Sequence, residues 1–172
     1  MADRPRPQDE VDDVVAAWRR ERPELTVSPM EVWSRIHRLA GVLDEHRKRS
    51  FAASGLENWE FDVLAALRKA GDPYQLSPGQ LLRETHVTSG TMTNRIDRLR
   101  GRGLVTREPD PSDGRAAVVA LTEQGRELVD QALTALLELE SSLLTGWGDE
   151  EIAALAGGLR RLLSSTTDVS PR

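Results

Sequence analysis

The sequence predicts a mainly α-helical protein with a single β-hairpin, and three observations support this prediction. Leu, Ala, Arg and Glu dominate the 172 residues, and these residue types favour helix. Apolar side chains recur at helical spacing through most of the chain. Only residues 104–121 show two short apolar runs on either side of a turn-rich segment. The length is that of one domain.

The N-terminal part, residues 9–50, is expected to hold two helices. Residues 1–8 are rich in proline and are expected to be disordered. A Ser-Pro pair at residues 28–29 provides the cap and the first-turn proline of an amphipathic helix that runs to about Arg49. Before it, Asp9 opens a helix with an apolar stripe made of Val11, Val14, Val15 and Trp18.

The middle of the chain contains the pattern of a helix-turn-helix. Asn58 is expected to cap a third helix, which Gly71 closes. Two short helices follow, one beginning at residues 77–78 and one capped by Thr88 that stops at Gly101 or Gly103. Because only three residues separate the two, they form the helix-turn-helix arrangement.

A β-hairpin is expected directly after the second short helix. Residues 104–108 and 116–121 read as strands, and the sequence PDPSDGR between them is a turn. A hairpin in this place is a wing. Residues 51–121 are therefore predicted to form a winged helix-turn-helix DNA-binding domain with a two-stranded wing.

Residues 122–166 are expected to form two C-terminal helices, one capped by Thr122 and one beginning at Asp149, with residues 167–172 as a tail. Both helices carry apolar stripes rich in Leu, as the N-terminal helices do in Val and Leu. One compact core could hardly cover every stripe, so we expect the terminal helices to form the dimerisation domain of a homodimer. A monomer with a larger helical core is the alternative.

Composition argues against several classes of protein. The chain has no cysteine, no apolar run long enough to span a bilayer and a polar N-terminus, so we expect a cytoplasmic, nucleoid-associated protein with no membrane contact. Its three histidines are scattered, and it has neither a nucleophile elbow nor a phosphate-binding glycine loop. We expect no enzymatic activity, no metal and no cofactor.

The charge pattern and the second short helix point to double-stranded DNA. The net charge is −5, yet residues 95–107 contain five arginines and one aspartate. On a helical projection Met92, Ile96 and Leu99 define the buried side. Asn94 and Arg98 lie opposite, with Thr91 on one flank, and can read adenine and guanine edges. Phosphate contacts are expected from Ser89, Thr93 and Arg102. The alternative is an ordinary solvated helix face.

Arg95 projects nearer the buried side of that helix, so it is expected to lean toward the protein body and to need a counter-charge. Asp62, in the apolar helix stretch FDVLAAL, is a candidate partner, because a carboxylate there is costly unless it is paired. The pair could be purely structural, or Asp62 could merely favour its helix N-terminus.

Over roughly residues 29–165, and most specifically from Val87 to Gly125, the chain resembles the MarR family of bacterial regulators. The matching motifs are Arg98-Leu99, Gly103-Leu104-Val105 with Arg107, Asp113-Gly114-Arg115, and Leu121-Thr122 with Gly125. If the hairpin acts as a wing, Arg115 is expected to enter the minor groove, with Asp113 holding it in place. The alternative is a solvated Arg115 on an Asp-Gly turn. The family commonly has arginine where Gly114 stands, so one basic contact is absent here.

A narrower resemblance, to the urate-responsive branch of that family, covers almost the whole chain. That branch is marked by four residues proposed to bind urate and pass on the signal, and these match Trp18, Asp62, Arg95 and Arg107. An aromatic plane and two guanidinium groups suit a planar anion. Core packing of Trp18 and a phosphate contact by Arg107 are the alternatives.

The resulting hypothesis is a homodimeric repressor that a small anion, first of all urate, releases from a pseudopalindromic operator. Another planar or carboxylate anion is the second candidate for the effector. Two other hypotheses stay open: a DNA-binding protein without an effector, and a winged-helix protein-interaction module that binds no DNA.

Overall fold

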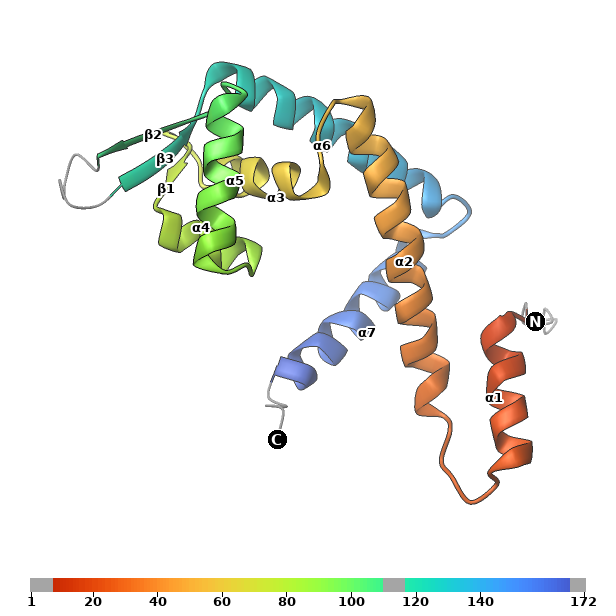
Figure 1. Ribbon diagram of the computed structural model, residues 1–172. Coiled ribbons are helices and arrows are strands. Elements are labelled where there is room, and N and C mark those ends of the chain that lie inside the picture. Colours follow the sequence, from red (N-terminus) through yellow and green to blue (C-terminus); the bar gives the residue numbers. More distant parts are fainter. Residues whose placement is uncertain (1–7, 110–116, 168–172) are drawn as a thin grey trace.

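The computed structural model describes residues 8–109 and 117–167, which form a winged-helix lobe and a set of long helices that extends from it (Figure 1). The elements are α1 (Glu10–Glu21), α2 (Pro29–Ala53), α3 (Asn58–Lys69), β1 (Gln75–Leu76), α4 (Pro78–Thr85), α5 (Ser89–Gly101), β2 (Val105–Pro109), β3 (Ala117–Leu121), α6 (Glu123–Leu143) and α7 (Asp149–Thr167). The mainly helical winged fold is confirmed.

The sheet has one strand more than the predicted hairpin. β2 and β3 pair antiparallel, with Arg107 opposite Val119. The short strand β1 pairs with the other edge of β3, so the order is β1-β3-β2. A two-residue strand shows no alternation of apolar and polar side chains, which is why the sequence pattern did not reveal it.

Most helix starts lie where the sequence predicted them. The Asp9 carboxylate accepts the Val11 N–H at 2.8 Å, and the Thr122 hydroxyl accepts the Gly125 N–H at 3.0 Å. Ser28 and Thr88 occupy the predicted cap positions of α2 and α5 but make no side-chain capping bond. One expected cap was wrong, because Glu57 rather than Asn58 occupies the cap position of α3. α2 also continues to Ala53, past the expected end, because Phe51 is buried in the core.

The main core lies in the winged-helix lobe. Leu64 and Leu67 of α3 meet Leu81 of α4 and Leu99 of α5, all fully buried. Val129, Ala132 and Leu136 of α6 join the same cluster. Because α6 contributes to this core and also packs on α2, it connects the lobe to the long helices.

The long helices, in contrast, leave apolar surface uncovered. α1 lies along the N-terminal half of α2, away from the lobe (Figure 1), and its Val11 and Val15 form a small buried cluster with Val27 of the connecting segment. α7 makes few contacts with the rest of its own chain. In the part of the chain that the structure describes, no helix is long and apolar enough to cross a membrane.

Candidate nucleic-acid interface and effector hollow

The second helix of the helix-turn-helix, α5, has one buried and one exposed face. Met92, Ile96 and Leu99 are at most 1% exposed and fix the helix against the core. The opposite face is polar and exposed, and it includes Ser89, Thr91, Thr93 and Asn94. The Thr93 hydroxyl donates to the backbone carbonyl of Ser89, one turn earlier in the helix, at 3.2 Å. This face is available to a nucleic acid.

Arg98, on the same helix, is held by the protein in this conformation. One terminal nitrogen, Nη2, donates to Glu57 Oε1 at 2.6 Å, and the guanidinium carbon lies 4.7 Å from the centre of the Trp59 ring. The side chain is still about half exposed, at 53%. Arg98 therefore lies at the surface with an internal partner.

Arg102, which the sequence predicts to contact phosphate, has two hydrogen-bond partners within the protein. Its Nη1 donates to Glu60 Oε2 at 2.6 Å and its Nη2 donates to the Gly55 carbonyl at 2.9 Å. Glu60 is buried, at 2% exposure. Because a buried carboxylate needs a counter-charge, Arg102 serves as that counter-charge in this conformation.

The wing carries Arg107 on β2, where its side chain is exposed beside the α5–β2 turn. The predicted minor-groove residue Arg115 and its brace Asp113 lie outside the described residues. The wing's DNA contacts thus remain sequence-based expectations.

Asp62 pairs with Arg47 of α2 rather than directly with Arg95. The distance from Arg47 Nη2 to Asp62 Oδ1 is 3.5 Å, and Arg47 also lies over the stacked Phe51 and Phe61 rings. Partial burial raises the pKa of Asp62, while the charges of Arg47 and Arg95 act in the opposite direction. Arg95 therefore influences this carboxylate through its charge and not through a hydrogen bond.

A hollow of roughly 270 Å³ lies where α2 meets α3. Its walls include Arg47, Asn58, Asp62, Ala40, Leu43 and Asp44. The Asn58 amide donates to Asp44 at 2.9 Å, while its Oδ1 is buried without a hydrogen-bond partner among the described residues. An unpaired acceptor, a guanidinium and a half-buried carboxylate line one small space, which suits a polar planar molecule that carries N–H donors.

Arg95 occupies the position expected from the helical projection. It is half-buried and leans over the Trp59 ring, with its guanidinium carbon 5.4 Å from the ring centre. Trp59 follows the Glu57 cap of α3, one turn before Asp62. Arg95 thus connects the recognition helix to the helix that carries Asp62.

Trp18 does not reach this hollow within one subunit. The Arg19–Glu31 ion pair, at 2.5 Å, places the end of α1 beside the start of α2, whereas Asp62 lies beside Arg47. Sixteen helical residues separate Glu31 from Arg47, which is about 24 Å along the axis. Trp18 is 47% exposed and does not line the hollow in a single subunit, so the grouping of the four effector residues stays a prediction.

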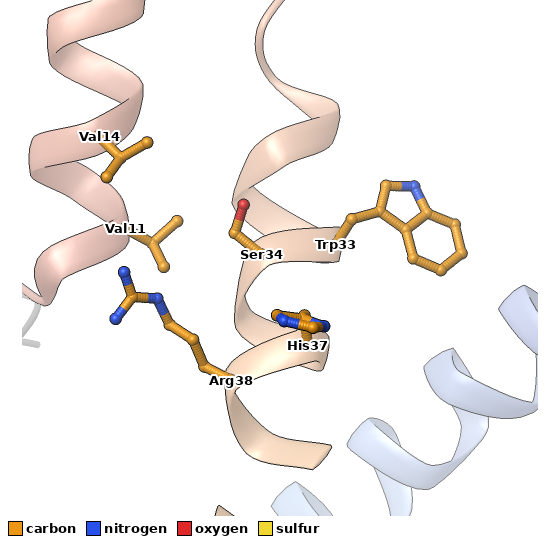
Figure 2. A pocket seen from close by; sticks show the side chains of 6 residues that line it. All are labelled: Val11, Val14, Trp33, Ser34, His37 and Arg38. Atoms are coloured by element: carbon orange, nitrogen blue, oxygen red, sulfur yellow. The ribbon is translucent and has the colours of Figure 1, made fainter. Parts of the chain in front are cut away.

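A second hollow, of roughly 380 Å³, lies between α1 and α2. Figure 2 shows Val11 and Val14 on α1 facing Ser34, His37 and Arg38 on α2, with the Trp33 ring turned away from α1. Arg38 forms an ion pair with Glu10, so its charge is already matched. Trp33 also lines an apolar groove beside Leu159 and Leu163 of α7.

Sequence reasoning missed four residues of these sites, namely Arg47, Glu57, Trp59 and Glu60. Each acts through a partner at least 15 positions away, such as Glu57 with Arg98, and no local pattern encodes such a contact. The described residues hold no group of three or more His, Cys, Asp or Glu that could bind a metal ion.

Known proteins resemble this chain over most of its length. The family model for the MarR family matches residues 54–116. The HTH-type transcriptional regulator PecS of Dickeya dadantii is 35% identical over 153 residues, which cover 89% of this chain and 92% of PecS.

Two solved structures show the same architecture. A mutant of MarR from E. coli, complexed with operator DNA, has a TM-score of 0.69 and 26% identity, and the match covers 81% of this chain and 98% of that one. Bordetella bronchiseptica BpsR, studied for regulation of its DNA binding by 6-hydroxynicotinic acid, has a TM-score of 0.65 and 27% identity, covering 81% of this chain and 94% of that one.

Proposed function

This chain belongs to the MarR family of DNA-binding transcriptional regulators, and on that premise we propose that it is a homodimeric repressor released from its operator by a small planar anion. The observation that carries the proposal is the two-faced recognition helix. Its apolar side is locked into the core, and its exposed side offers Asn94, Thr91 and Ser89 to a major groove.

The dimer is supported by the uncovered apolar side chains of the long helices. Trp33, Leu155, Leu159 and Leu163 are all more than 40% exposed in a single subunit. Trp33 lies on α2 and the three leucines lie on α7. Between the two helices runs a groove whose walls include Trp33, Ile36, Leu159 and Leu163. Contiguous apolar surface of this kind marks an interface, and a second copy of the chain is the partner we propose.

The effector proposal centres on the hollow between α2 and α3. A planar anion there would pair with Arg47 and donate an N–H to Asn58 Oδ1. Its negative charge would also repel the Asp62 carboxylate, which interacts electrostatically with Arg95 of the recognition helix. Trp18 does not line the hollow in its own subunit, and we propose that it joins the site from the second copy. Urate is the first candidate ligand. BpsR, whose DNA binding is regulated by a flat aromatic acid, supports the wider class.

The DNA-binding part is tested by selecting duplexes from a random pool with the purified full-length chain. We expect a pseudopalindromic sequence, bound as a dimer, with an affinity that falls steeply as salt rises because phosphate contacts release counterions. A chain that retains no duplex at low salt would instead act as a protein-interaction module.

The effector part is tested by titrating the complex with urate and, separately, with 6-hydroxynicotinate. We expect one of these anions to release the DNA, and Arg47→Ala in the wall of the hollow or Trp18→Phe to blunt the release, while the control Arg20→Ala on the exposed tip of α1 leaves it unchanged. A complex that neither anion dissociates would contradict this effector proposal and favour a DNA-binding protein without an effector.

A further inference from the structure

The recognition helix is clamped to the start of α3 by a cluster of four side chains: Glu57, Trp59, Arg95 and Arg98. The Trp59 ring lies within 5.4 Å of the Arg95 guanidinium carbon and 4.7 Å of that of Arg98. Guanidinium groups over an indole face are attracted by the ring's quadrupole. Trp59 therefore provides a platform for the two arginines of α5 that lie nearest to it.

Glu57 closes this cluster with one carboxylate. Its Oε2 accepts the Trp59 indole N–H at 2.8 Å, and its Oε1 accepts an N–H from Arg98 at 2.6 Å. These two hydrogen bonds hold the pKa of Glu57 below its ordinary value of 4.5, so the group is charged at neutral pH. A single anion thus fixes both the platform and one of the arginines on it.

The Glu57–Arg98 contact occupies an N–H group of Arg98 that DNA binding would also use. Arg98 shares the exposed side of α5 with Asn94, and a guanidinium reads guanine or grips a phosphate through the same terminal N–H groups. The pair is open to exchange, because both side chains are more than half exposed, at 53% for Arg98 and 58% for Glu57. The neighbouring Arg102–Glu60 pair differs, since Glu60 is buried.

We propose that Glu57 is an internal competitor of DNA: it holds Arg98 against Trp59 in the free protein, and DNA must replace it to recruit Arg98. Glu57 is thus a positioning residue that weakens operator binding, and the exchange of one anion for another is part of recognition. This inference rests on the proposed DNA-binding function of α5.

The first test compares Glu57→Gln with the unchanged chain on the duplex selected by the full-length protein. Glutamine keeps an oxygen for the Trp59 N–H but loses the charge that holds Arg98. We expect binding to tighten roughly two- to fivefold, the range that corresponds to an exposed ion pair. Glu57→Ser is the second variant, because serine is a good helix cap and cannot reach Arg98.

The control for net charge is Glu84→Gln. This variant also loses one negative charge, but the partner of Glu84 is Lys69 of α3 rather than a residue of the recognition helix. We expect this variant to bind as the unchanged chain does. Equal tightening in Glu84→Gln and Glu57→Gln would overturn the proposal, because the effect would then come from overall charge.

A double-mutant cycle with Arg98→Ala decides whether Glu57 acts through Arg98. We expect Glu57→Gln to have no effect on affinity in the Arg98→Ala background, and to tighten the selected duplex more than a scrambled one in the unchanged background. Tightening that persists without Arg98, or no tightening at all while the unchanged chain binds DNA, would refute the inference. If the unchanged chain binds no duplex, the proposed function itself fails.

Discussion

Among single residues, Glu60 carries the most costly charge in the lobe. It is 2% exposed, and it accepts N–H groups from Arg102 at 2.6 Å and from the Glu57 backbone at 2.9 Å. Arg102→Ala would leave this carboxylate without a cation. We expect the free energy of unfolding to fall by about 2–3 kcal/mol, at the low end for a broken buried pair because Arg102 is partly exposed.

Urea denaturation measures this loss, and Arg100→Ala is the matched control. Arg100 lies on the exposed surface of α5, two residues before Arg102, and is paired with Asp97 at 3.4 Å. Its replacement should therefore lower the free energy of unfolding by less than about 0.5 kcal/mol. Equal urea midpoints for the two variants would contradict the structural role of Arg102.

Asp62 is expected to lower stability at neutral pH. Burial raises its pKa above 3.8, so the unfolded chain releases this proton at a lower pH than the folded chain does. Between those two pKa values, rising pH therefore favours the unfolded state. Asp62→Asn should raise the urea midpoint at pH 7, and the gain should vanish once the pH falls below 3.8.

The measurement is a pair of urea titrations of both chains, one well above and one below the ordinary pKa of 3.8. A carboxylate retained against stability is typical of a functional site. A variant that is less stable than the parent at neutral pH would show instead that the Arg47 contact outweighs the burial.

At the scale of elements, Gly125 allows the start of α6 to lie close to the backbone of Leu104, the residue before β2. A Cβ at this position would lie 2.0 Å from the Leu104 carbonyl oxygen, which is backbone and cannot turn aside. Gly125→Ala should therefore destabilise the chain by about 1–3 kcal/mol, as overpacking does. The control, Gly41→Ala in the middle of α2, meets no atom within 4 Å and should stabilise it by about 0.5–1 kcal/mol.

Thermal or urea unfolding of the two alanine variants distinguishes these effects. Shifts of opposite sign are expected. A Gly125→Ala chain as stable as the Gly41→Ala chain would mean that α6 can move away from Leu104 at no cost.

Helix faces could be predicted from the sequence because they depend on local spacing. The period of α5 correctly assigned Met92 and Ile96 to the core and Asn94 to the surface. Spacing gives the direction in which a side chain leaves its helix but not which partner it meets. Arg102 illustrates this, since its partner Glu60 lies 42 positions away on another helix. The Asp62–Arg47 pair was missed for the same reason.

At the scale of the whole molecule, the uncovered surface of α2 and α7 predicts a dimer. Leu159→Glu places a charge in the groove beside Trp33 and should shift the protein to a monomer in sedimentation equilibrium. The matched control is Leu25→Glu, a leucine of similar exposure between α1 and α2. Dimerisation unchanged by Leu159→Glu, or lost equally in both variants, would contradict this interface.

The most direct test of the central account is a hydroxyl-radical footprint of the full-length chain on its selected duplex. Two recognition helices related by a two-fold axis should protect two half-sites whose centres lie about one helical turn, roughly 10 base pairs, apart. Asn94→Ala should weaken both halves of the footprint together. A single protected half-site, or protection that Asn94→Ala leaves unchanged, would contradict a dimeric regulator that reads DNA through α5.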